Sequence, residues 1–267
     1  MPKGEVYVRE TGTGDHTVVL LHGFSDHSGT WCRVAPTLSE RYRVLAVDLP
    51  GFGRSAEHWT APLFDHYVDV LDDLLAGTEK PVSLIGNSLG AVTSLVYASA
   101  RPARVRRVVL SDMPGVAGIP RLWTRGARLP VELSRLLTRP VPAPLVQRTI
   151  GALYARAAVH RPGSLDRAVR TAFSANFATR RQVDALLSVG RHAIHELGRL
   201  PIPEMVHALD MPALLVWGAR DRLTPANAAR RVDADGTRRV VIIPDAGHCP
   251  HLDAPQEFLD VVLPFLE

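Results

Sequence analysis

The segment that most limits the fold of this chain is the pentapeptide G-N-S-L-G at positions 86–90. Residues 81–85 before it form a short, mostly apolar run, typical of a strand buried in a parallel sheet, and residues 91–98 have the pattern of a helix with a face of small residues. Ser88 is therefore expected on a tight strand-to-helix turn, flanked by glycines because a Cβ atom at either position would clash as helix and strand close on each other. There its oxygen stands at a helix N-terminus, where amide N–H groups and the helix dipole favour negative charge.

Strand and helix patterns alternate over most of the chain, which is typical of a mostly parallel, doubly wound α/β sheet. Between 114 and 205 the alternation stops, and this stretch is helical in pattern, interrupted by prolines and without a convincing strand. We therefore predict an α/β core formed by residues 1–113 and 206–267, with a helical lid inserted at 114–205. The expected strands are 17–21, 42–47, 81–85, 107–110, 213–217 and 240–243, and the expected helices are 29–40 (with Ser28 as N-cap), 64–75, 91–98 and two that begin at 225 and 255.

A serine hydroxyl is a poor nucleophile at neutral pH and needs a base, usually histidine, and an acid that orients the base. In an open parallel sheet these groups are expected at the carboxyl ends of strands. Asp221 follows the strand at 213–217, and His248 lies in the last strand-to-helix loop, so the chain order is serine, aspartate, histidine. Asp112 also ends a strand and is the alternative acid, although Asp221 is favoured. Asp245 is interpreted as a turn residue.

With these motifs in place, the chain resembles the alpha/beta-hydrolase superfamily over almost its whole length. The tripeptide at 22–24 (His-Gly-Phe) is similar to the oxyanion loop of that family, which implies an oxyanion hole formed by the backbone amides of Phe24 and Leu89. Residues 48–55 resemble its D-x-x-G-x-G-x-S loop, residues 218–221 its G-x-x-D motif and residues 247–248 its terminal G-H. His22 and Asp48 are then expected to have structural roles, His22 by binding backbone near the oxyanion loop and Asp48 by holding its glycine-rich loop.

The resemblance implies a serine hydrolase that cleaves a carboxylic ester through an acyl-enzyme on Ser88. One alternative is a C–C bond hydrolase acting on a vinylogous diketone, because Asn87-Ser88 resembles the elbow of those enzymes, although Ala91 stands where many of them have a second glycine. A small-molecule receptor is the non-enzymatic alternative. No cofactor and no metal are expected, and the partner is a small acyl substrate. Three aromatic residues of the lid are candidates for substrate contact: Trp123, Phe173 and Phe177.

Composition narrows the class further. Of 267 residues, 46% are hydrophobic and 22% are charged, and no apolar run is long enough to span a membrane. No secretory signal precedes the first strand, so we expect a cytoplasmic protein without stable membrane anchoring, and either a monomer or a homodimer. With only Cys32 and Cys249, no disulfide framework is expected.

The basic residues are concentrated in the predicted lid. Residues 114–205 contain fourteen arginines against five acidic residues and no lysine, a net charge of +9 in a chain of +4. The simplest interpretation is that these arginines solvate outer helix faces, with an acidic substrate or a membrane surface as alternatives. No nucleic-acid partner is expected, because aromatic residues are not interleaved with the basic ones.

Overall fold

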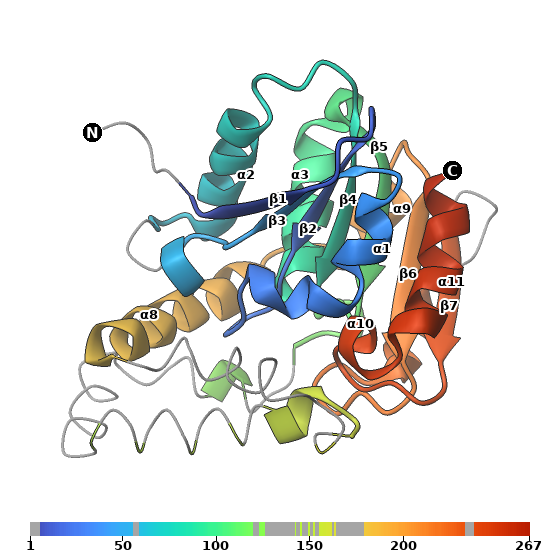
Figure 1. The fold of residues 1–267 in the computed structure, drawn as a ribbon. Coiled ribbons are helices and arrows are strands. Elements are labelled where there is room, and N and C mark those ends of the chain that lie inside the picture. Colours follow the sequence, from blue (N-terminus) through green and yellow to red (C-terminus); the bar gives the residue numbers. More distant parts are fainter. Residues whose placement is uncertain are drawn as a thin grey trace.

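The structure is a computed structural model that describes residues 6–55, 59–119, 123–125, 142, 145, 149, 152, 155–161, 163, 179–232 and 238–267. Seven described strands form one sheet in the order β1-β3-β2-β4-β5-β6-β7 (Figure 1), in which β1 is antiparallel to β3 and every other pair is parallel. The strands are β1 (Val8–Thr11), β2 (Thr17–Leu21), β3 (Arg43–Val47), β4 (Val82–Asn87), β5 (Val105–Ser111), β6 (Ala213–Gly218) and β7 (Arg238–Ile243). β4, which leads to Ser88, therefore lies at the centre of the sheet.

The central strands are apolar on both faces, and each face has its own core. Every residue of β2, β4 and β6 is buried. Along β2 the side chains alternate, so that Val19 and Leu21 belong to one core while Val18 and Leu20 belong to the other. Continuous burial of this kind is what a parallel sheet covered on both sides requires.

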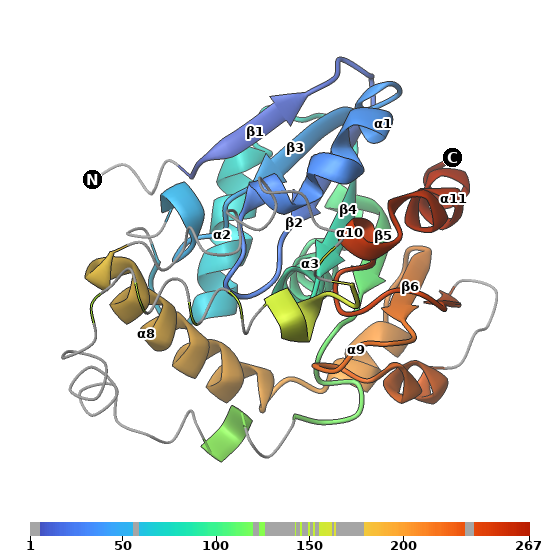
Figure 2. The same cartoon turned by 60° about the horizontal axis from the view of Figure 1, so that its bottom comes forward.

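Helices cover the sheet on both faces (Figures 1 and 2). One core contains buried residues of α2 (Leu63–Leu74), α3 (Leu89–Ala100), α8 (Arg180–Leu197) and α9 (Ile202–His207). The other contains buried residues of η1 (Ser28–Arg33), α1 (Ala35–Ser39) and α11 (Pro255–Leu266). Further short helices are η2 (Gly53–Ser55), η3 (Pro102–Arg104), η5 (Ala226–Arg231) and α10 (Pro250–Asp253), and residues 123–125 and 155–158 are also helical.

The sequence-based elements agree with the structure except at three places. The six expected strands are all present, but β1, an antiparallel edge strand, was not expected. The helix expected at 29–40 is two short ones, η1 and α1, because Pro36 in the first turn of α1 has no N–H to continue a hydrogen-bond ladder. The N-cap is His27 and not Ser28, since Nδ1 of His27 accepts the N–H of Gly29. The helix expected from 225 is only the short 3₁₀ helix η5.

Much of the predicted lid at 114–205 lies outside the described residues, so its separation from the core stays a prediction. The described part includes α8, which begins with a capping box: Thr179 Oγ1 accepts the N–H of Gln182, whose side chain accepts the N–H of Thr179. α8 packs against α2, and Phe24 lies so close to it that a Cβ on Gly190 would lie 2.8 Å from the phenyl ring.

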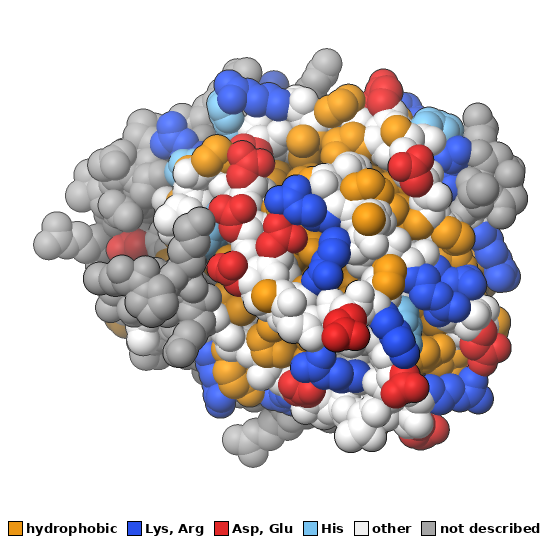
Figure 3. Space-filling view, turned by 90° about the horizontal axis from the view of Figure 1, so that it is seen from above, with side chains coloured by type: hydrophobic (Ala, Val, Ile, Leu, Met, Phe, Trp, Pro, Cys, Tyr) orange, Lys and Arg blue, Asp and Glu red, His pale blue; other side chains and the backbone are white. Residues whose placement is uncertain are grey.

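Two features of the structure concern the predicted lack of membrane and nucleic-acid partners: the length and polarity of its helices, and the distribution of charge on its surface. No helix among the described residues is long and apolar enough to cross a membrane. On the face shown in Figure 3, the coloured acidic and basic side chains are interspersed, with no broad patch of one sign.

Candidate functional site

Ser88 occupies a strained turn between β4 and α3. Its backbone has φ 54° and ψ −114°, a conformation that L-residues rarely adopt, and its N–H donates to the carbonyl of Ser111 on the next strand over a distance of 2.9 Å. The two flanking glycines are required by close backbone contact. A Cβ on Gly86 would overlap the carbonyl oxygen of Gly90, and one on Gly90 would overlap that of Leu21. The pentapeptide therefore holds Ser88 at the carboxyl end of the central strand β4.

The loops after β6 and β7 bring a carboxylate and an imidazole together. His248 Nδ1 lies 2.8 Å from Asp221 Oδ2, and both residues are buried. The hydroxyl of Thr224 donates to Asp221 Oδ2, while the N–H groups of Leu223 and Thr224 donate to Oδ1 at 2.7 and 3.0 Å. Burial alone would raise the pKa of Asp221, but the His248 charge and these hydrogen bonds bring it below its usual value. Asp221 is therefore held ionised against the ring.

Ser88 and His248 belong to loops that contact each other directly. Asn87 Nδ2, one residue before the serine, donates to the carbonyl of His248 at 2.8 Å. On its other side the histidine loop adjoins the acid loop, because a Cβ on Gly218 would overlap the carbonyl of Gly247. The three segments that carry Ser88, Asp221 and His248 thus form one packed unit.

The predicted oxyanion loop lies against the serine turn. A Cβ placed on Gly23 would lie 3.2 Å from the Cβ of Ser88. Any larger residue at position 23 would therefore have to displace the Ser88 side chain slightly. His22 fixes this loop: its Nδ1 donates to the carbonyl of Gly23 at 2.7 Å and its Nε2 accepts the N–H of Leu49 at 2.9 Å. Burial lowers the pKa of His22, in keeping with this neutral tautomer. The structural role expected of His22 is confirmed.

Asp48 also has the structural role that was expected, and a further one. Its Oδ2 accepts the N–H of Arg54 at 2.9 Å, which closes the glycine-rich loop, and its Oδ1 accepts the N–H of Ser28 at 2.6 Å. The second bond joins that loop to η1. The side chain of Asp245, in contrast, is two-thirds exposed in a turn and stands 3.9 Å from Arg161, away from the buried pair.

Asp112, the alternative acid, lies beside Asp221 but faces other partners. Its Oδ1 accepts the N–H of Gly218 at 2.9 Å and its Oδ2 accepts the hydroxyl of Ser111 at 2.7 Å. Burial, followed by the charge of Asp221, raises the pKa of Asp112 well above its usual value. One ligand atom from each of Asp112, Asp221 and His248 lies within 4.8 Å of the others, so these residues could hold a cation only by giving up the Asp221–His248 bond.

His251, on α10 three residues after His248, is a further buried imidazole. His251 Nε2 is 3.1 Å from Thr30 Oγ1, and its ring packs on that of Trp31 at a centroid distance of 4.3 Å. Burial and the neighbouring His248 lower its pKa to about 3, so the ring is neutral at physiological pH.

For the other residues singled out from the sequence, the structure gives less information about a possible role in the site. Trp123 is described and half-buried, whereas Phe173 and Phe177 lie outside the described residues, so substrate contact by these three stays a prediction. Cys32 is exposed and Cys249 buried, and neither forms a disulfide bond with another described residue.

Three supporting residues were not assigned these contacts from the sequence: Asn87, Thr224 and Asp253. Asp253 Oδ2 accepts the N–H groups of Gly247 and His160, both at 2.8 Å, and so joins the histidine loop to the described residues 155–161. The spacing of Asp221 and Thr224 offered a signal, since an aspartate that accepts N–H groups two and three residues later is a common turn pattern. The contacts of Asn87 and Asp253 had no local signal.

Comparison with known proteins places this arrangement in a family. The profile described as "Alpha/beta hydrolase family" matches residues 18–261. The chain is 31% identical to a pimeloyl-[acyl-carrier protein] methyl ester esterase of Nitrosomonas europaea, over 95% of this chain and 96% of that protein. It is 29% identical to a 2-hydroxy-6-oxo-6-(2'-aminophenyl)hexa-2,4-dienoic acid hydrolase of Metapseudomonas resinovorans, over 96% of this chain and 86% of the other.

A solved structure agrees in fold. The Cfl2 protein of Burkholderia cenocepacia superposes with a TM-score of 0.81 at 23% identity, covering 98% of this chain and 92% of that one. With a family profile that extends over most of the sequence and a relative above 30% identity along nearly its whole length, the assignment follows: this chain belongs to the alpha/beta hydrolase family.

Proposed function

We propose that the protein is a serine hydrolase that cleaves a carboxylic ester through an acyl-enzyme on Ser88. The observation that carries the proposal is the position of Ser88, at φ 54° on the turn after the central strand. It directly follows Asn87, whose side chain donates to the carbonyl of His248, and His248 forms a buried pair with Asp221. A serine held this way presents its oxygen outward, and a histidine whose Nδ1 faces a carboxylate has Nε2 left to accept a proton.

The proposed reaction begins with attack of Ser88 Oγ on the ester carbonyl carbon while His248 Nε2 takes the hydroxyl proton. Asp221 holds the tautomer and stabilises the imidazolium. The amides of Phe24 and Leu89 receive the oxyanion, a contribution of about 10²–10³ in rate per donor. His248 then protonates the departing alkoxide. A water molecule, deprotonated by His248, attacks the acyl-enzyme and releases the acid and the free serine.

The ester as substrate class is supported by the relatives. The protein of Nitrosomonas europaea is named an ester hydrolase, and this chain covers nearly its full length. A second candidate is hydrolysis of a C–C bond in a vinylogous diketone, which is supported by the dienoic acid hydrolase of Metapseudomonas resinovorans and by the likeness of Asn87-Ser88 to the elbow of such enzymes.

A substrate panel distinguishes these readings. We expect turnover of p-nitrophenyl acetate and butyrate and no turnover of a 2-hydroxy-6-oxo-dienoate, whereas a C–C hydrolase would favour the dienoate and a receptor would turn over neither. Ser88→Ala should lose both turnover and labelling by a fluorophosphonate probe. The half-buried Ser39 of α1, whose hydroxyl donates to the carbonyl of Pro36, is changed to alanine as the matched control and should keep both. Labelling that survives in Ser88→Ala would refute the proposed nucleophile.

A further inference from the structure

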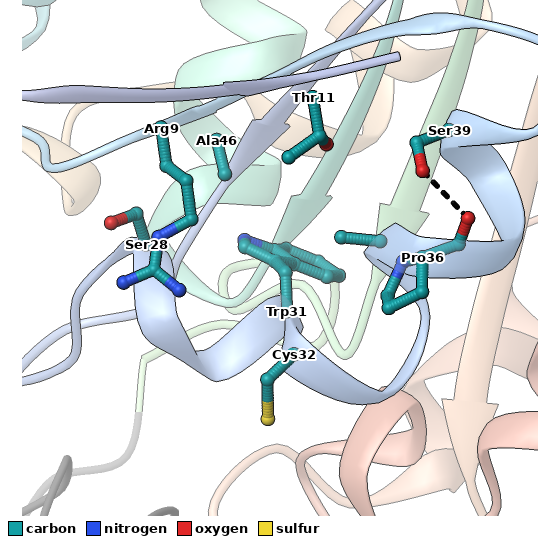
Figure 4. Close-up of a pocket in the computed structure, with 9 residues that line it drawn as sticks. Arg9, Thr11, Ser28, Trp31, Cys32, Pro36, Ser39 and Ala46 are labelled. Atoms are coloured by element: carbon teal, nitrogen blue, oxygen red, sulfur yellow. Dashed lines mark hydrogen bonds between the residues drawn. The ribbon is translucent and has the colours of Figure 1, made fainter.

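We propose that the hollow between β1, η1 and α1 is a binding site for an amphipathic carboxylate, with the acid group at Arg9 and a short apolar chain in the hollow (Figure 4). This site is separate from Ser88. One of its lining residues is the buried Trp31, which belongs to the core on the η1 and α1 face of the sheet, whereas Leu89 beside Ser88 belongs to the other core.

The apolar part of the site has the size and lining for a short chain. The hollow has a volume of about 300 Å³, and its apolar lining consists of Trp31, Cys32, Ala35, Pro36 and Ala46, of which Trp31 and Ala46 are buried. Figure 4 shows Arg9 and Thr11 reaching toward it from β1 on one side, and Pro36 and Ser39 of α1 closing the other. Enclosure by apolar side chains with few polar groups is typical of sites for small organic ligands.

The polar end contains three hydrogen-bond donors without a partner. The buried atoms Ser28 Oγ, Trp31 Nε1 and His27 Nε2 make no hydrogen bond to the described part of the chain. Because His27 Nδ1 accepts the N–H of Gly29, the proton of the neutral ring is on Nε2, which is therefore a donor. Buried donors are nearly always satisfied, so these three, on neighbouring residues, suit an acceptor that is not among the described residues.

Arg9 supplies the charge. Its guanidinium lies beside Ser28 in Figure 4, and it lines both this hollow and an adjoining one of about 230 Å³ that His27 and Ser28 also line. No ion pair joins Arg9 to another described residue, whereas Arg43 on the neighbouring strand is paired with Glu10 at 2.6 Å. The exposed Arg9 side chain is also the part of the wall that can move aside to admit a ligand.

The charges around this end favour an anion over a cation. The carboxylate of Asp48 lines the second hollow, but both of its oxygens already accept backbone N–H groups, those of Ser28 and Arg54. Arg54 adds a second cation there, stacked on the Tyr7 ring at 4.4 Å. The carboxyl of Asp26, next to His27, is also buried, and burial raises its pKa, which reduces the negative charge at this end. The Arg9 guanidinium, which forms no ion pair with another described residue, and the neutral donors suit a monoanion such as a carboxylate, and the adjoining apolar hollow suits its chain.

The test uses hexanoate and the indole N–H signal of Trp31 in ¹H–¹⁵N spectra of the whole protein. The chain has four tryptophans, and Trp31→Phe identifies the signal. We expect hexanoate to shift this signal to saturation, and hexanol or inorganic phosphate to bind at least about tenfold more weakly, since each lacks one half of the recognition. Arg9→Gln should weaken hexanoate binding about tenfold or more.

The matched control is Arg239→Gln. Arg239 is exposed on β7, the opposite edge strand of the sheet, and should leave the hexanoate affinity unchanged. The site is refuted if hexanoate does not move the Trp31 signal, if hexanol binds as tightly as hexanoate, or if Arg9→Gln and Arg239→Gln bind hexanoate equally. Because the readout is binding at Trp31 and not turnover, the result is independent of the reaction proposed for Ser88.

Discussion

The carboxylates of Asp112 and Asp221 approach the same histidine from neighbouring strands, yet only Asp221 hydrogen-bonds to it. The difference lies in what satisfies each acid. Asp221 accepts two N–H groups and a hydroxyl from its own turn and keeps Oδ2 on His248, whereas Asp112 is occupied by Gly218 and Ser111. Two carboxylates this close cannot both ionise easily, and the directions of their pKa shifts are opposite.

Replacing each acid by its amide tests this division. Asp221→Asn should lower kcat by about 10⁴-fold, because an amide that donates to His248 favours the wrong tautomer. Asp112→Asn should cost about tenfold at most, because an uncharged amide resembles the protonated acid and keeps an acceptor for Gly218. Steady-state kinetics on p-nitrophenyl butyrate measure both. A larger loss in Asp112→Asn would identify Asp112 as the functional acid.

The strained backbone of Ser88 predicts a difference in stability between two variants that both lack the hydroxyl group. Ser88→Gly should be more stable than Ser88→Ala by about 1 kcal/mol, since only glycine adopts φ 54° freely. Chemical denaturation of the two inactive variants measures the difference.

The matched control is Ser94, which lies inside α3. In an ordinary helix interior the order reverses, and Ser94→Gly should be less stable than Ser94→Ala by about 1 kcal/mol. The same order at both positions would contradict the strain at Ser88.

Glu196 predicts that α8, which lies within the predicted lid at 114–205, stabilises the core. Its carboxylate accepts the N–H groups of Leu63 at 2.7 Å and Phe64 at 3.1 Å, which are among the free amides at the N-terminus of α2. Glu196→Ala should lower the free energy of unfolding by about 1–3 kcal/mol, because those amides lose their acceptor. Glu204→Ala, an exposed position on α9, should change it by less than about 0.5 kcal/mol. Equal effects in urea unfolding would contradict this role of Glu196.

His251 predicts how stability depends on pH. The unfolded ring binds a proton near its usual pKa of 6.5, whereas the folded ring does so only at about 3. Between these values the unfolded chain binds one more proton, so the free energy of unfolding falls as the pH is lowered, by about 1.4 kcal/mol per pH unit from this residue. His251→Gln should therefore lose less stability between pH 6 and 4 than the wild type. Unfolding curves at several pH values test the slope, with His207→Gln as the matched control, and an unchanged slope in His251→Gln would reject the assignment.

The parts of the fold that could be predicted from the sequence are those in which buried residues form a recognisable local pattern. The strands β2 and β6 are continuous, mostly apolar runs because both faces of the sheet are covered. β1 was not predicted, because three of its four residues are exposed and its sequence shows no alternation of apolar and polar residues. It forms by pairing with β3. Pro36 can be seen in the sequence, but the sequence alone did not show that the helix expected at 29–40 would be divided into two short helices.

The candidate site divides in the same way. Ser88, Asp221 and His248 each follow a recognisable strand and were found from sequence order, although their catalytic roles stay predictions. Asn87 and Asp253 could not be assigned, because Asn87 acts on a residue 161 positions away and Asp253 holds two segments 87 residues apart. Contacts of this kind exist only once the sheet has brought its loops to one edge.

The hydrogen bonds of Glu196 also bear on where this protein could be divided. A cut at residue 205, where the helical pattern ends, would remove the carboxylate that the amides of α2 require. Shortened or exchanged versions of the insertion should therefore keep α8 and join upstream of Thr179, its N-cap. By the same logic, a relative that varies the predicted lid would be expected to retain an acceptor at this position, because without one the first amides of α2 would lose their hydrogen bonds.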